Sequence, residues 1–137
     1  MDIRDAQREI MVRIRRLRAK VGGDEFYWSG MAADYESKYG SSEEAYDKGF
    51  KYRYYDKAEF CAEVEKFDGL WYSKRRMDVR RFVRLVNSLI NKLFKIGIDN
   101  KDMKTIGEKL AQIEEELRKA ECSRASGRKK KKSAKGG

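Results

Sequence analysis

Histidine and proline are absent from this 137-residue chain, and cysteine occurs only twice. Without histidine, the chain lacks the side chain that most often acts as acid–base catalyst or metal ligand near neutral pH, so histidine-based triads, zinc sites and haem sites are excluded. Cys61 and Cys122 alone cannot complete a four-ligand zinc or iron–sulfur site within one chain. We expect both thiols to be reduced and buried rather than joined in a disulfide.

Long apolar runs are missing as well. The longest candidate, Phe82 to Ile98, is shorter than the ~18–20 residues needed to cross a bilayer, and polar residues interrupt it, namely Arg84, Asn87, Asn91, Lys92 and Lys95. The first residues show no positive charge followed by an apolar stretch, so we expect no secretory signal. These observations predict a soluble, cytoplasmic protein without a membrane partner, with a nuclear or nucleoid-associated location as the alternative.

Charge is present in excess, and it is unevenly distributed. The chain has 33 Lys and Arg against 23 Asp and Glu, a net charge of +10. Counted by segment, the net charges are +4 for residues 1–23, −6 for 24–73, +7 for 74–98, −2 for 99–122 and +7 for 123–137. Such basic segments favour a polyanionic partner.

Apolar residues recur at helical spacing in three segments, residues 2–21, 73–96 and 100–121. Gly97 suits the left-handed end of the second segment. Because the connection that follows is short, we expect residues 74–121 to form an antiparallel helical hairpin.

The middle of the chain is harder to interpret. Residues 24–72 hold 14 of the 16 aromatic residues, and the sequence from Ser41 to Glu44 fits a helix capping box. Residues 50–55 alternate as a strand would, but we prefer a helix there, because an isolated strand has no evident partner.

Together these patterns predict an all-α fold, a small bundle of about four to five helices. Residues 1–122 would form a single helical domain. Residues 123–137 would be a basic tail, disordered when free, because they contain no large apolar side chain. Apolar seams of this kind also permit self-association.

The segment from residue 74 to 98 carries a basic stripe with no acidic residue between Val79 and Ile98. A solvated helix face usually mixes both signs, so an unmixed stripe indicates a phosphate backbone as partner. The alternative is that the acidic middle segment or the last helix pairs with it. The candidate phosphate-binding residues are Arg76, Arg80, Arg81, Arg84, Lys92 and Lys95.

Three further groups are candidates for nucleic-acid contact. Arginine predominates on the first helix and suits bidentate phosphate binding, whereas the tail resembles a nonspecific arm or a localisation patch, or serves only solubility. Two tyrosines among cations could stack on unpaired bases, although core packing is the favoured role for them. These candidates are Arg8, Arg15 and Arg16; Arg128, Lys129, Lys130, Lys131 and Lys132; and Tyr52 and Tyr54.

No motif for catalysis, metal binding or a cofactor is evident, and we assign no catalytic or metal-ligating residue. Acidic residues of the middle segment are abundant enough for a magnesium-dependent nuclease, but nothing in their spacing fixes a site. The leading hypothesis is therefore a non-enzymatic nucleic-acid-binding accessory protein, with RNA or a ribonucleoprotein favoured over duplex DNA. The competing hypothesis is a protein-binding module, an inhibitor or scaffold, that docks through its acidic aromatic segment.

Overall fold

The computed structural model describes residues 2–39, 50–73, 77–98 and 100–136. Within this part of the chain the backbone forms helices and no strand, which confirms the all-α prediction. The helices are α1 (Ile3–Val21), α2 (Glu25–Tyr39), α4 (Phe50–Trp71), α5 (Val79–Ile96) and α6 (Lys101–Gly136).

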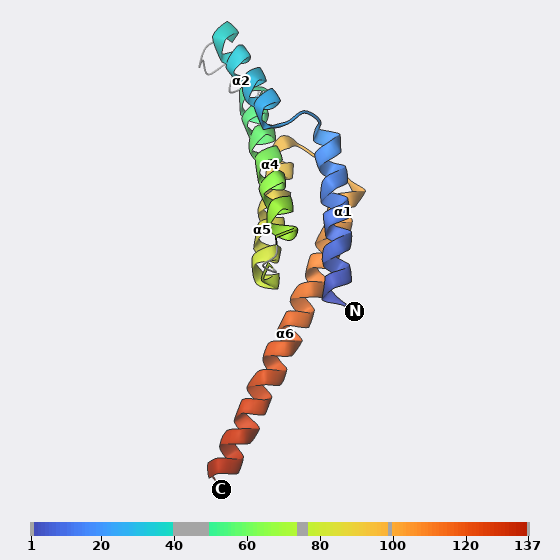
Figure 1. The fold of residues 1–137 in the computed structure, drawn as a ribbon, viewed down its shortest axis with the longest axis vertical. Coiled ribbons are helices and arrows are strands. Elements are labelled where there is room, and N and C mark those ends of the chain that lie inside the picture. The colour runs from blue at the N-terminus through green and yellow to red at the C-terminus, as the bar shows by residue number, and fades with distance from the viewer. Residues whose placement is uncertain (1, 40–49, 74–76, 99, 137) are drawn as a thin grey trace.

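The helices form a bundle from which two elements project (Figure 1). α4 is the central helix, since α1, α2 and α5 all pack against it. α2 lies antiparallel to the first half of α4 and makes an arm at one end of the molecule, whereas α6 runs alongside α1 and continues beyond the opposite end. The packed region therefore lies between the arm and the far part of α6.

α1 has the boundaries that its sequence predicts. Asp2 Oδ1 accepts a hydrogen bond from Arg4 N at 2.9 Å, which satisfies one of the free N–H groups of the first turn. The helix ends at Gly22, and Gly22 and Gly23 both adopt positive φ, at 74° and 60°. A Cβ on Gly23 would lie 2.5 Å from the Tyr27 ring, so this corner requires glycine.

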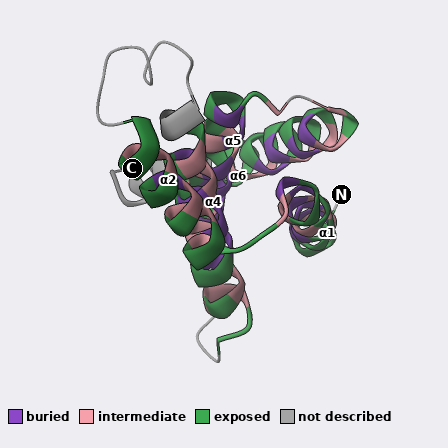
Figure 2. Ribbon diagram, turned by 90° about the horizontal axis from the view of Figure 1, so that it is seen from above, coloured by how far each residue is buried: buried purple, intermediate pink, exposed green. Residues whose placement is uncertain are grey.

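The core forms from the apolar faces of α1, α4, α5 and α6. Figure 2 shows the buried sides of these helices turned toward one another, whereas α2 buries only Ala32. Each full burial of a large aliphatic or aromatic side chain contributes about 1.5–3 kcal/mol to folding. The most enclosed side chains include Ile10, Ile14 and Leu17; Phe60, Val64 and Phe67; Phe82, Leu89 and Leu93; and Ile106 and Ile113.

α5 and α6 form the predicted antiparallel pair, but they are splayed. Gly97 ends α5 with φ 86°, and Asn100 Oδ1 accepts hydrogen bonds from the backbone N–H groups of Asp102 and Met103. α5 begins at Val79, later than predicted. α6 packs mainly against α1 and touches α5 only sparsely, because its apolar seam meets the seam of α1.

α6 continues through residues 123–136 to Gly136, while the disorder of this basic tail when free stays a prediction. Lys, Arg and Ala have high helix propensity, so the composition of this segment is compatible with helical backbone. Among residues 101–123, whose side chains the structure describes, Ile113 is the last buried one, and Figure 1 shows the C-terminal part of the helix projecting past the bundle.

The remaining expectations have separate outcomes. Residues 50–55 are helical, as preferred, and α2 is their partner. The proposed capping box at residues 41–44 lies outside the described residues. Both cysteines are free thiols, but only Cys61 is buried. The expectation of burial is wrong for Cys122, because it lies on the exposed part of α6 beyond the core.

Candidate nucleic-acid interface

The cations of α1 divide into an inner and an outer group. Arg13 lies against α6, where its Nη1 donates to Asp102 Oδ1 at 2.9 Å. This hydrogen bond and the charges of Asp102 and Glu9 raise the Arg13 pKa. Arg16 is exposed and lies 3.9 Å from the same carboxylate, and Arg8 is exposed with a 3.6 Å ion pair to Asp5. Only the outer group remains open to an external ligand.

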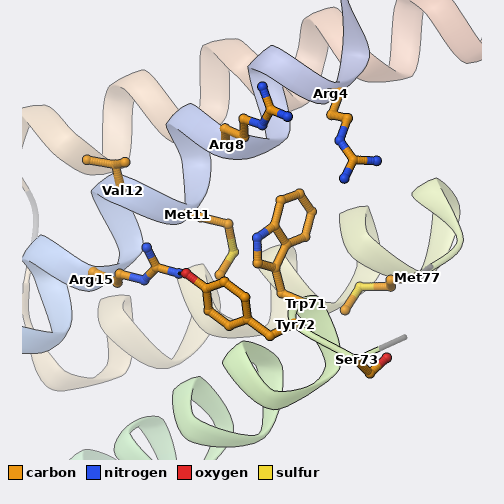
Figure 3. Close-up of a pocket in the computed structure, with 9 residues that line it drawn as sticks. All are labelled: Arg4, Arg8, Met11, Val12, Arg15, Trp71, Tyr72, Ser73 and Met77. Atoms are coloured by element: carbon orange, nitrogen blue, oxygen red, sulfur yellow. Dashed lines mark hydrogen bonds between the residues drawn. The ribbon is translucent and has the colours of Figure 1, made fainter. Parts of the chain in front are cut away.

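An arginine-lined cleft lies between α1 and the end of α4 (Figure 3). Its volume is about 610 Å³, within the range of small-ligand sites. Among the described residues that line it there is no carboxylate, so its rim is cationic and its floor apolar. The lining residues are Arg4, Arg8, Met11, Val12 and Arg15 from α1, with Trp71, Tyr72, Ser73 and Met77.

The aromatic side of the cleft is held in place by both the core and α1. The Trp71 ring lies 5.6 Å from the Phe82 ring, centroid to centroid, so Trp71 is anchored on the core. The Tyr72 hydroxyl accepts a hydrogen bond from Arg15 Nη2 at 2.5 Å, and Arg15 Nε lies 3.5 Å from Asp68 Oδ1. Tyr72 is nevertheless 70% exposed, so most of its ring faces solvent.

The basic stripe on α5 is interrupted by acidic residues of other helices. Arg80 pairs with Glu121 of α6, and the Lys92 side chain, 17% exposed, lies 3.1 Å from Glu59 and 3.6 Å from Glu63 of α4. Burial acts to lower the Lys92 pKa, but the hydrogen bonds and charges of these two carboxylates raise it overall. At Lys92 the internal-pairing alternative is therefore the one that the geometry supports.

Three other cations of the stripe face solvent. Arg81, Arg84 and Lys95 are exposed, and none forms an ion pair within the described part of the chain. Arg76 lies outside the described residues, as do the side chains of Arg128 and of residues 129–132. The stripe thus offers a smaller open cationic surface than its sequence indicates.

Tyr54 packs inside the molecule rather than presenting a free ring. Its ring stacks on Trp28 with centroids 5.9 Å apart and an interplanar angle of 16°, and Tyr35 approaches its edge. Trp28 also donates from Nε1 to the carbonyl of Gly22, and Lys57 lies 4.2 Å from its ring centroid. The packing role that the sequence favoured therefore fits Tyr54, while the Tyr52 side chain lies outside the described residues.

Sequence reasoning placed Arg4 on the basic face of the first helix without selecting it as a site residue, and it did not consider Trp71 or Tyr72 for the site. Their grouping depends on the approach of α1 to the end of α4, which no local pattern encodes. One signal was available, since only Ser73 separates the aromatic pair at residues 71–72 from the basic run at 74–76. An aromatic–basic junction of this kind is typical of single-strand binding surfaces.

Among the described residues, no group of three or more acidic or cysteine side chains converges as a metal site would require. The described helices likewise include none that combines the length and the apolar character of a membrane span. Comparison with protein-family models, with curated proteins and with solved structures found no match to this chain.

Proposed function

We propose that this chain is a non-enzymatic nucleic-acid-binding accessory protein, with RNA or a ribonucleoprotein as the favoured partner. The observation that carries this proposal is the cleft that Arg4 and Arg8 line together with the exposed aromatic ring of Tyr72. Guanidinium groups bind phosphate through charge-assisted hydrogen bonds. Contacts with backbone and shape, rather than with base edges, would dominate, because the chain has no sequence-reading motif.

The position of the C-terminal part of α6 supports the same function. Residues 123–137 contain seven Lys and Arg and no acidic residue. Figure 1 shows this part of α6 leaving the bundle at the end where α1 begins and α4 finishes, which is the end that carries the cleft. A strand bound in the cleft would therefore meet a second concentration of positive charge nearby.

The proposal is tested by measuring the binding of labelled single-stranded RNA, single-stranded DNA and duplexes. Fluorescence anisotropy gives the affinities at low and at physiological salt. The double variant Arg4→Glu, Arg8→Glu should weaken binding by about tenfold or more, because it reverses two phosphate-binding charges. The matched control is Lys101→Glu, Lys104→Glu, which makes the same charge change on two exposed residues that do not line the cleft. It should change affinity by only about twofold, since neither residue would contact the bound phosphates.

The contribution of the tail is separable in the full-length chain. Changing residues 129–132 from Lys to Gln should reduce the slope of log affinity against log salt by about 3, because each lost phosphate contact contributes 0.7–0.9. Absence of binding to any of these nucleic acids at low salt would sink the proposal. Binding that persists in the Arg4→Glu, Arg8→Glu variant and disappears with the tail change would assign it to the tail and not to the cleft.

A second function is favoured by one observation, the exposure of aromatic side chains on the arm formed by α2 and the first half of α4. Phe26 is 83% exposed, and Tyr27 and Tyr39 are also exposed. Aromatic side chains are enriched in protein–protein hot spots, and residues 24–73, which include this arm, have a net charge of −6. A chain that binds no nucleic acid would most readily act through this arm, as a protein-binding module.

A further inference from the structure

The cleft between α1 and α4 combines cationic side chains with an exposed aromatic ring, and a simple anion would need only the cations. Arg4 forms no ion pair with any described residue, and the one ion pair of Arg8 is solvent-exposed. These two cations suit an anion such as a phosphate group. Phosphate alone, however, makes no use of an exposed aromatic ring a few side chains away.

Tyr72 is presented to the cleft as a preoriented platform. Its hydroxyl accepts a hydrogen bond from Arg15, and Arg15 forms an ion pair with Asp68, so the ring is restrained from its polar end. The Arg15 guanidinium carbon lies over the ring, 5.3 Å from the centroid, and the side chain is nevertheless 70% exposed. Because the ring is already ordered, a planar group that stacks on it loses less conformational entropy on binding.

The shape of the cleft indicates which nucleic acid fits. Its floor is formed by Met11 and Trp71, and Figure 3 shows Arg4 extending toward the Trp71 ring. A cleft of about 610 Å³ is large enough for one nucleotide. A duplex keeps its bases stacked on one another and exposes only their edges in the grooves, whereas a single strand can turn out a base.

We propose that this cleft is a binding site for one unpaired nucleotide of a single strand, with the base stacked on Tyr72 and the adjacent phosphates held by Arg4 and Arg8. This inference rests on the proposed nucleic-acid-binding function and specifies its ligand. It assigns Arg15 and Asp68 to positioning the Tyr72 ring rather than to binding phosphate. It also assigns base contact to Tyr72, in place of the tyrosines that the sequence indicated.

The test compares two single strands of equal length and equal phosphate number, a uridine oligonucleotide and the corresponding abasic strand. The full-length protein should bind the uridine strand at least about fivefold more tightly, the smallest effect expected from stacking one base. Tyr72→Ala should abolish this preference and leave the affinity for the abasic strand unchanged. Tyr72→Phe, which keeps the ring and removes the hydroxyl, should retain most of the preference.

Tyr39→Ala is the matched control, since it removes a similarly exposed tyrosine from the arm and should leave the preference intact. Equal wild-type affinity for the two strands would overturn the inference and leave the proposed function standing. The inference would also be overturned if Tyr72→Ala weakened both strands equally, because the ring would then have a structural role, or if a duplex bound as tightly as the uridine strand. Failure of every strand to bind at low salt would overturn the proposed function itself.

Discussion

α1 and α5 have similar sequences in one respect, an apolar face opposite a set of cations, yet the structure uses their cations differently. α1 lies against both α6 and α4, and acidic residues of both helices meet it, Asp102 at Arg13 and Asp68 at Arg15. α5 packs mainly on α4, and carboxylates meet it at Lys92, from α4, and at Arg80, from α6. Its other described cations, Arg81, Arg84 and Lys95, stay exposed. The function of a basic helix therefore depends on which neighbours it has, and not on its own charge.

α1 and α5 are most alike in their apolar faces. Substitutions in these faces should have the largest effects on the free energy of unfolding. Phe82→Ala should lower the free energy of unfolding by about 3–5 kcal/mol and Ile14→Ala by about 2–5 kcal/mol, because each leaves a cavity among fully buried side chains. Phe82 is enclosed by the Phe67 and Trp71 rings, and Ile14 lies at the centre of the α1 seam. Urea denaturation followed by circular dichroism measures both. Losses below about 1 kcal/mol would contradict the packing described.

Substitution of two cations on α5, Lys92 and Arg84, should have opposite consequences. The first should lower stability and the second should lower nucleic-acid affinity. Lys92→Met removes the partner of Glu59 and Glu63 and should lower stability by up to about 1 kcal/mol, a modest value because both carboxylates are partly solvated. It should leave nucleic-acid affinity unchanged. Arg84→Met removes an exposed, unpaired cation, so stability should change by less than about 0.5 kcal/mol while affinity falls.

Urea denaturation measures the stability of the two variants, and fluorescence anisotropy measures their affinity for nucleic acid. If Lys92→Met weakened nucleic-acid binding as much as Arg84→Met did, the distinction between inner and outer cations on α5 would be wrong.

The smallest effect concerns Asp56, which is only 6% exposed and has no hydrogen-bond partner for Oδ2 among the described residues. Desolvation by burial raises its pKa, with Glu59 adding to the shift while Lys95 and Lys92 oppose it. The folded chain thus binds this proton more tightly than the unfolded chain. The ionised carboxylate therefore destabilises the fold at neutral pH, and this destabilisation fades as the pH falls through the folded pKa toward the unfolded one.

Asp56→Asn should accordingly raise the thermal midpoint at pH 7. The corresponding gain in the free energy of unfolding should be no more than about 1 kcal/mol. The gain over the wild type should shrink progressively on acidification. A variant that is less stable than the wild type at pH 7 would show that Asp56 contributes a favourable interaction with Lys95 that outweighs its burial.

Local sequence signals predict the helices well, because their determinants are local. The cap at Asp2, the left-handed Gly97 and the apolar spacing of α1, α5 and α6 each act within one or two turns. The preference for helix at residues 50–55 is likewise confirmed. The late start of α5 at Val79 is set by the Asp78 cap, whose carboxylate accepts from Arg80 N at 3.2 Å.

The candidate site was predictable only in part. Arg8 and Arg15 lie on the cleft, as cations of a basic face can, but Lys92 pairs internally because α4 places Glu59 and Glu63 beside it. Tyr54 packs on Trp28 because α2 folds back along α4. Such pairings depend on tertiary neighbours, and a single sequence does not reveal which helices become neighbours.

α6 is the longest described helix, and much of its length lies beyond the bundle. A helix of 36 residues spans about 54 Å, and the part beyond Ile113 extends for roughly 34 Å. Under the proposed function, a single strand bound in the cleft would have to span much of this distance to contact the basic residues at the end of α6, so strand length as well as charge would affect affinity.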